Sequence, residues 1–331
     1  MQLTVVGQFI HSIMIIILFS FIIFIAFILS FIINKAVKHT NWYINKLQYA
    51  NMLPSITGKF QYSIVNLGSN PARFAFFYEN VNGANLSTGT QDLYMDLCIL
   101  KQYKNRIKNG AYVLLPIVPF SSITAYLTQK KLGTSYFLKF HAINWCKNSE
   151  DLKIRDAAKK RLKYPLCYNP IGTLKAIIHD SERDKRLEIT EMNMMYADLI
   201  TDAAQWMEGW KQEFDIEDLN TPLNATLTEA RKKSVEMFRE IINYCILQGY
   251  KPIIILPPIQ KELGKLFTPQ IKEIYIDSFI REFENYHLPY FDYMKDERFS
   301  ESNLFFNTLF MNLRGRKQFT NEILKKLNIN E

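Results

Sequence analysis

The chain has 331 residues, of which 48% are hydrophobic and 14% aromatic, so it can bury a sizeable core in one large domain or two small ones. Its formal net charge is +8, but the basic residues are scattered and no nucleic-acid-binding module is recognisable, so a nucleic-acid partner is not expected. The five His and four Cys have no metal-ligand spacing, and we expect neither a metal nor a cofactor.

The first 34 residues predict a membrane anchor. Residues 9–33 contain no Asp, Glu, Lys or Arg, and as a helix they would reach about 37 Å, enough to cross a bilayer. The run is too long for the apolar part of a signal peptide, and no small-x-small cleavage site follows it. We therefore expect a single retained transmembrane helix in the cell membrane, followed by a juxtamembrane linker over residues 35–59.

The charges next to this span bear on its orientation and its surroundings. Lys35 and Lys38 follow the span and no Lys or Arg precedes it, so the positive-inside rule favours a cytoplasmic domain. A basic surface beside a membrane suits an anionic lipid or an anionic envelope polymer. Simple solubility is the alternative explanation of the same charge.

From residue 60 to residue 331, strand and helix signals alternate. Short apolar runs predict strands at residues 62–67, 81–86, 111–118, 252–256 and 288–293. Apolar residues at helical spacing predict helices at residues 72–79, 227–246, 271–284 and 313–327, and one that Thr90 caps and Gly110 ends. Strands separated by helices predict an α/β fold with a doubly wound parallel sheet.

Residues 121–222 interrupt this alternation. They are polar, rich in aromatic residues and poorly periodic, and they include Trp206 and Trp210. We interpret them as a large, partly helical insertion over the carboxyl ends of the strands, where sheets of this kind build their sites. Such an insertion would be a lid, a partner-docking surface or an ordinary packing subdomain.

The first motif with chemical potential is Gly68-Ser69, which follows the first predicted strand and precedes Asn70. A Ser at a strand-to-helix turn is exposed at the edge of the sheet, where backbone N–H groups at the helix start can support a nucleophile. Taken alone, this pair is weak evidence, because many helices start in the same way without any chemistry.

With its surroundings, this motif resembles the SGNH/GDSL hydrolase superfamily, in the membrane-anchored branch associated with bacterial envelope polysaccharides. The segment Asn-Leu-Ser-Thr-Gly-Thr-Gln-Asp-Leu-Tyr at residues 85–94 looks like the second block of that family, whose Gly supplies an oxyanion N–H. The resemblance implies that Ser69 is the candidate nucleophile and Gly89 the candidate oxyanion donor, with Asn70 and Asn85 lining the site.

The resemblance covers the sheet elements in residues 60–118 and 250–327. It implies a three-layer, flavodoxin-like α/β/α domain over residues 60–331, with residues 121–222 as the insertion. The family's third block normally carries an Asn after the strand at 111–118, but this chain has Pro-Phe-Ser-Ser at residues 119–122.

The last block departs from the family in its chemistry. The family pattern is Asp-x-x-His, then an apolar residue, an Asn and, shortly after, a Gly. Here Asn307 stands for the Asp and Phe310 for the His, while Asn312 and Gly315 continue the frame. Phe310 cannot take a proton from Ser69, and Asn307 cannot stabilise an imidazolium. The resemblance therefore implies degenerate acid and base positions, with Asn312 lining the same site.

Other residues could replace the missing base or acid. His141 and His179 lie in the insertion, which could bring one of them over the nucleophile. His287 precedes the last predicted strand and so lies at the wrong end of it. Asp292 and Asp296 lie near the other end of that strand and could act as local acids.

Three classes of function follow. The first is a binding or scaffolding subunit of envelope glycan assembly or modification, with a degenerate triad. The second is an active acyl-ester hydrolase or O-acyltransferase that works on a cell-surface polysaccharide through Ser69. The third, an unrelated flavodoxin-like binding domain, is disfavoured because no Gly-rich phosphate loop is present.

The expected partners are an envelope glycan or acyl-glycan and a membrane glycosyltransferase, acyltransferase or exporter. This envelope role places the domain outside the cytoplasm, in conflict with the positive-inside rule.

Overall fold

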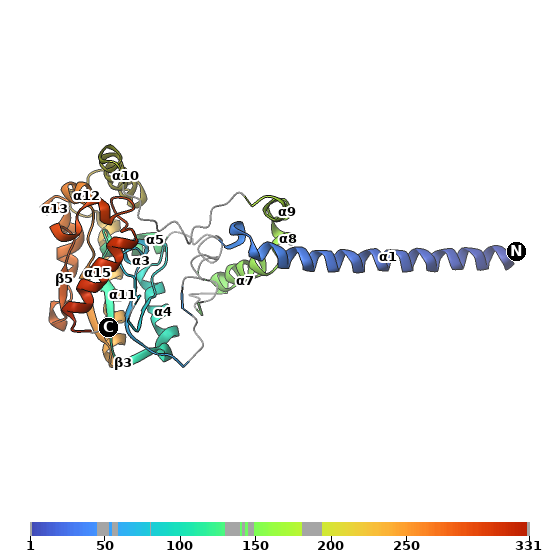
Figure 1. The fold of residues 1–331 in the computed structure, drawn as a ribbon, viewed down its shortest axis with the longest axis horizontal. Coiled ribbons are helices and arrows are strands. Elements are labelled where there is room, and N and C mark those ends of the chain that lie inside the picture. The colour runs from blue at the N-terminus through green and yellow to red at the C-terminus, as the bar shows by residue number, and fades with distance from the viewer. Residues whose placement is uncertain are drawn as a thin grey trace.

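The computed structural model describes residues 2–44, 53–54, 59–79, 81–129, 140, 143–144, 149–180 and 194–329. A long helix, α1 (Gln2–Ala36), projects away from an α/β domain (Figure 1). The stretch Ile13–His39 contains an 18-residue window with a mean hydropathy of 3.2, of which nothing is buried, so the described part of the chain has one helix long and apolar enough to cross a membrane. About half of the expected linker at residues 35–59, namely residues 45–52 and 55–58, lies outside the described residues.

Five strands form one parallel sheet in the order β2-β1-β3-β4-β5. They are β1 (Tyr62–Asn66), β2 (Gly83–Asn85), β3 (Ile107–Pro116), β4 (Lys251–Leu256) and β5 (Tyr290–Asp292). Val65 in β1 pairs with Ala84 in β2 on one side and with Val113 in β3 on the other. The chain moves outward from β1 to β2 and then back across β1 to β3, so the strand order reverses beside β1. The predicted parallel α/β sheet is confirmed.

Alternate residues of the strands face two separate cores, as the two-residue period of a strand requires. Val65 and Val113 belong to a large core with α4 (Leu93–Tyr103) and α11 (Ala225–Leu247). Ile64 and Leu114 belong to a smaller core with α15 (Leu313–Lys326). Helices therefore cover both faces of the sheet.

Two predicted helices are wrong in extent. The helix expected at residues 72–79 is only the short α3 (Asn70–Arg73), because the chain leaves it to bury Phe76 against Phe319 of α15, with ring centroids 5.6 Å apart. The helix expected from Thr90 to Gly110 begins after Asp92, whose carboxylate accepts the Met95 N–H (2.8 Å), and ends at residue 103. Residues 107–110 belong to β3 instead.

The helices between β3 and α11 lie in two places. They are α5 (Ala125–Gln129), α7 (Ser149–Lys163), α8 (Pro165–Tyr168), α9 (Pro170–Ile178) and α10 (Tyr196–Phe214). Figure 1 shows α10 with the sheet domain but α7, α8 and α9 at the base of α1. The expectation that residues 121–222 as a whole cover the strand ends is therefore wrong for residues 149–178.

The remaining elements follow β4 and β5. The helices are α12 (Lys261–Leu266), α13 (Pro269–Lys272) and α14 (Ser278–Arg281), the last two joined by a π-helical turn, Glu273–Asp277, within the helix expected at 271–284. Short 3-10 turns lie at Val37–His39, Lys104–Arg106, Ser121–Ile123, Glu284–Tyr286, Glu297–Phe299 and Ser302–Leu304.

Candidate functional site

A pocket of about 360 Å³ lies at the carboxyl edge of the sheet, beside the point where the strand order reverses. Parallel α/β sheets bind ligands at this place, because the loops that follow neighbouring strands diverge there. The loops after β1, β2 and β3 contribute to the pocket, together with α10 and the loop before α15. The lining residues are Ser69, Asn70, Pro71, Thr90, Gln91, Asp92, Val118, Pro119, Thr124, Leu127, Trp206, Trp210, Glu213, Phe214, Leu309 and Phe310.

The turn that carries Ser69 is built around Gly68. Gly68 has φ +109°, and a Cβ atom there would lie 2.8 Å from the Cβ of Ala72, so only glycine fits. Ser69 is half-buried and precedes α3, and its side chain makes no capping hydrogen bond. Ser69 thus lies at the sheet edge and lines the pocket, but it is half-buried where we expected it exposed, and the helix after it has only four residues and gives it little dipole support.

A buried carboxyl group is hydrogen-bonded to the backbone of this turn. Asp96 on α4 accepts the Gly68 N–H (2.9 Å) and the Gln91 Nε2–H (2.5 Å) on the same oxygen. Burial raises the pKa of Asp96 to about 7, although both hydrogen bonds act to lower it. Sequence reasoning missed this residue; an acid among Met95, Leu97 and other apolar residues of one helix was the available signal.

Residues 86–92 form a loop that Gln91 holds in place. The Gln91 Oε1 accepts the Thr88 N–H (2.9 Å), and its Nε2 donates to the Leu86 carbonyl (3.2 Å). Gly89 is buried and does not line the pocket, but its neighbour Thr90 does. Thr90 has φ +62°, an uncommon conformation for a β-branched residue, and strain of this kind is concentrated at functional sites.

Phe310 and Asn307 occupy distinct places in the loop before α15. Phe310 lines the pocket with Ser69 and stacks on Phe74, with ring centroids 4.8 Å apart, while its edge meets Trp206 at 5.3 Å. Asn307 turns its side chain onto its own loop, where Oδ1 accepts the N–H groups of Leu309 (3.0 Å) and Phe310 (2.7 Å). The structure thus brings Phe310 into the pocket of Ser69.

Helix α10 forms the aromatic wall of the pocket. Trp206 and Trp210 lie one turn apart, with ring centroids 5.7 Å apart, and both line the pocket. Asp202, one turn earlier, accepts the Thr308 N–H (2.9 Å) and the Thr308 hydroxyl, which ties α10 to the loop of Phe310.

The loop after β3 lines another side of the pocket. Val118 and Pro119 line the pocket, and the Val118 N–H donates to the Ser121 Oγ (2.9 Å). Phe120 is fully buried with φ +66° and packs against Trp210, with ring centroids 4.9 Å apart. No side-chain amide stands here, in agreement with the segment Pro-Phe-Ser-Ser at residues 119–122.

Two residues expected to line the site have structural roles instead. The Asn85 amide donates to the carbonyls of Arg73 and Phe76 (both 3.0 Å), so it holds the chain that follows α3. Asn312 is fully buried and caps α15, with its Oδ1 accepting the Gly315 N–H (2.9 Å). Asn70 lines the pocket as expected.

No histidine that the structure describes lines the pocket. His179 ends α9 near α1, and His287 precedes β5 with φ +51°, at the amino end of that strand. His141 lies outside the described residues.

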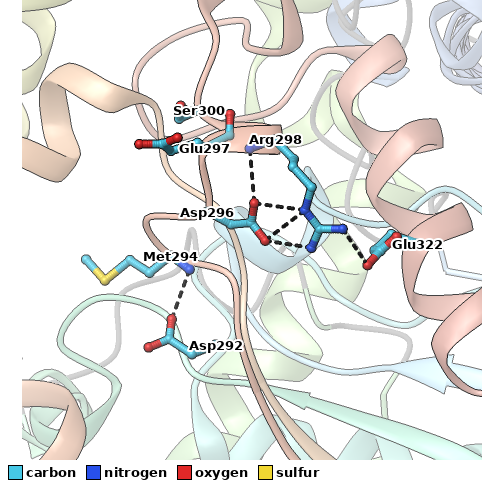
Figure 2. A network of polar contacts seen from close by, with 7 residues as sticks. All are labelled: Asp292, Met294, Asp296, Glu297, Arg298, Ser300 and Glu322. Carbon is cyan, nitrogen blue, oxygen red and sulfur yellow. Dashed lines mark hydrogen bonds and ion pairs between the residues drawn. The ribbon is translucent and has the colours of Figure 1, made fainter.

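The two acids near the end of β5 are engaged in other contacts (Figure 2). Asp296 accepts the Arg298 Nη2–H (2.7 Å), and Arg298 also pairs with Glu322 on α15 (3.0 Å). The hydrogen bond from Arg298 lowers the pKa of Asp296, which keeps it charged. Asp292 accepts the Met294 N–H (3.0 Å) and pairs with Lys272 (3.0 Å). Neither acid lines the pocket of Ser69.

No protein-family model matches the chain, and no curated protein matches it significantly in sequence.

Proposed function

We propose that this chain is a membrane-anchored, SGNH-like protein of bacterial cell-envelope glycan assembly or modification, whose pocket binds a glycan or acyl-glycan without cleaving it. The observation that carries the proposal is the contact made by Phe310. It stands in the pocket of Ser69, packed between Phe74 and Trp206, at the position where the resemblance expects the histidine base. A phenyl ring cannot accept the hydroxyl proton, so the serine has no general base there.

The strand order supports the finer fold assignment. The order β2-β1-β3-β4-β5 with all strands parallel is the flavodoxin-like arrangement that the resemblance implies. The pocket lies at its switch point, and the segment between β3 and α11 is the insertion, of which α10 contributes the pocket wall.

The lining of the pocket supports an amphipathic ring as its ligand. Trp206, Trp210 and Phe310 supply flat apolar faces, while Ser69 and Thr90 supply hydroxyl groups at the rim. Aromatic faces with a few polar groups are suited to a sugar ring, which presents C–H faces and hydroxyl edges.

The pocket also has room for more than one ring. A second hollow of about 250 Å³, toward α11, shares Asp92 and Thr124 with it. Two neighbouring hollows that share lining residues suit an oligosaccharide better than a single small metabolite.

Retention of α1 is supported by its tertiary contacts. Asn34 is almost completely buried, and its Oδ1 accepts the Leu166 N–H (2.9 Å) from a segment far along the chain. A signal peptide that is removed would not be expected to take part in such packing. We place the domain outside the cytoplasm, where an envelope glycan would be found.

Binding is tested with the full-length chain in detergent and a panel of bacterial envelope oligosaccharides, with and without O-acetyl groups, by isothermal titration calorimetry. Trp206→Ala should weaken binding roughly tenfold or more, since a central aromatic anchor often contributes about 2 kcal/mol. Trp42→Ala, at the base of α1, is the matched control and should bind as the wild type does. Failure of the wild type to bind any member, or equal loss in both variants, would contradict the proposal.

An active esterase or O-acyltransferase is the second candidate. The observation in its favour is that the Ser69 side chain makes no capping bond at α3 and lines the pocket. Such an enzyme would need a base other than a histidine of the described residues: a carboxylate of the pocket, Asp92 or Glu213, or His141, which lies outside the described residues. Covalent labelling of Ser69 separates this candidate from a binding protein.

A further inference from the structure

The segment at the base of α1 carries a surface that the pocket does not use. The last turn of α7, with α8 and α9, forms a collar, defined here as residues 159–178. The collar contacts the end of the long helix, where the Asn34 Oδ1 accepts the Leu166 N–H (2.9 Å) and the Tyr43 hydroxyl donates to the Leu162 carbonyl (2.6 Å). Figure 1 shows α8 and α9 beside this end of α1.

These contacts fix the level of the collar along the membrane span. The side chains of α1 are exposed from Ile13 to Leu29, whereas Ser30 and Ile33 are half-buried and Val37 is buried. A bilayer core of about 30 Å takes about 20 helical residues. A span that starts near Ile13 therefore ends near Ile33. The collar meets α1 in this last apolar turn, where the acyl chains give way to the headgroups.

Helix α9 buries one face and carries exposed apolar side chains on the opposite face. Thr173 and Ala176 are buried, and α9 contacts α1. On the opposite face, Ile171, Leu174 and Ile178 follow a helical spacing and are exposed by 81%, 42% and 84%. Single exposed aliphatic residues are common, but an aligned stripe of them beside a membrane span points to lipid as its environment.

The charges of the collar suit the headgroup layer. It contains no Asp or Glu, and its basic residues are all exposed: Lys159, Lys160, Arg161, Lys163 and Lys175. Within the described part of the chain, none of them forms an ion pair with an acidic side chain. Tyr164 and Tyr168 are also exposed, each beside a cation, which is typical of residues at a membrane interface.

We propose that the collar is a lipid-binding surface. The stripe of α9 inserts among the acyl chains, and the basic residues hold the headgroups of anionic phospholipids. The inference rests on the proposed anchoring of α1, and it adds a second attachment that fixes the orientation of the domain on the membrane.

Depth in the bilayer tests the stripe. The full-length chain, with its other accessible cysteines replaced by serine, is reconstituted in vesicles of phosphatidylglycerol and phosphatidylcholine. A nitroxide is attached at Ile178→Cys, and its collisions with oxygen and with a water-soluble nickel complex are compared. The label should favour oxygen, as a lipid-embedded group does. Leu247→Cys on α11 is the matched control, since Leu247 is 79% exposed on the sheet domain, and its label should favour nickel.

The same measurement distinguishes failure of the collar proposal from failure of the proposed anchoring of α1. A label at Phe24→Cys, in the middle of α1, reports whether the anchor lies in the bilayer. If the label at Ile178 favours nickel, as the one at Leu247 does, while the label at Phe24 favours oxygen, the collar proposal is overturned and the anchoring stands. This result is expected if the stripe contacts a protein partner instead of lipid. An aqueous label at Phe24 overturns both the anchor and the collar.

Headgroup selectivity tests the charges. The ratio of phosphatidylglycerol to phosphatidylcholine that remains bound to the full-length chain after detergent extraction is measured by mass spectrometry. Lys160→Gln/Arg161→Gln should reduce the preference for phosphatidylglycerol roughly tenfold, because two surface charges are removed. Lys104→Gln/Lys108→Gln makes the same charge change on the sheet domain and should leave the ratio unchanged. Equal ratios in the wild type and the collar variant would overturn the anionic selectivity.

Discussion

The carboxyl group of Asp96 is buried and hydrogen-bonded to the turn that presents Ser69. It accepts the Gly68 N–H (2.9 Å) and is held by Gln91, which lines the pocket. Burial raises its pKa to about 7 from an ordinary value of 3.8. The protonated carboxyl is therefore the form that the fold favours at mildly acidic pH.

This raised pKa predicts how stability depends on pH. Between about pH 4 and about pH 7, folded Asp96 holds a proton that the unfolded chain has lost, so its stabilising contribution is full at the acidic end and lost as pH rises. Asp96→Asn keeps the shape of the protonated acid and cannot titrate. Between these pH values the free energy of unfolding of the wild type, measured by urea denaturation, should fall by a few kcal/mol because of Asp96. This fall should be absent from Asp96→Asn.

Asp198→Asn on the exposed side of α10 is the control and should retain the pH dependence of the wild type. An Asp96→Asn profile parallel to that of the wild type would show that Asp96 is already ionised at low pH in the fold.

Several individual residues of the candidate site follow from the sequence. Gly68-Ser69 predicted a turn at the sheet edge, and the resemblance placed Phe310 in the same site as Ser69, where both line the pocket. Asp96 and Gln91 did not follow, because their roles depend on hydrogen bonds across the β1 and β2 loops that no periodic pattern records. The roles of Asn85 and Asn312 also depend on which backbone groups are left for them to satisfy.

At the scale of elements, the start of α15 is fixed by close packing as well as by its cap. A Cβ atom on Gly315 would lie 2.1 Å from the carbonyl oxygen of Leu304, so the first turn of the helix presses directly on the preceding loop. The Gly in the last block therefore has a packing reason that is independent of chemistry.

A pair of glycine substitutions tests this packing. Gly315→Ala should lower the free energy of unfolding by about 2 kcal/mol or more, because the helix must move off the Leu304 carbonyl. Gly264→Ala is the matched control, a buried glycine of α12 whose Cβ would find its nearest neighbour at 3.8 Å. That change should be neutral or stabilising by up to about 1 kcal/mol. The reverse order of the two effects in thermal or urea unfolding would contradict this packing.

Strand positions were more predictable than helix extents. The runs at residues 64–65 of β1, 113–116 of β3 and 252–256 of β4 are buried on both faces and are therefore apolar. By contrast, α3 ends early because Phe76 is drawn into the core with Phe319, a contact between segments far apart in the chain. Tertiary packing of this kind overrides local helix propensity.

At the scale of the whole molecule, residues 121–222 divide between two places. From the sequence we expected all of them to lie over the ends of the strands. Residues 149–178 attach to the base of α1 through Asn34 and Tyr43, while α10 remains on the sheet. Composition showed that residues 121–222 interrupt the alternation of strands and helices. It did not show that one part of them packs at the base of α1 and another part on the sheet. The partners of such contacts are separated by more than a hundred residues, and local patterns carry no record of them.

The molecule therefore combines a helix able to span a membrane, a collar that we propose binds lipid, and a pocket lined by both Ser69 and Phe310. The central claim is that this pocket binds a ligand and does not catalyse acyl transfer. It rests on the position of Phe310 against Phe74 and Trp206.

The most direct test is fluorophosphonate labelling of the purified full-length chain beside its Ser69→Ala variant, with cooperative unfolding as proof that both are folded. We predict no labelling of the wild type above the level of the variant, since Phe310 stands where the resemblance expects the base and no histidine that the structure describes lines the pocket. Labelling of the wild type that disappears in Ser69→Ala would contradict the claim and show that a base reaches Ser69 from another part of the chain.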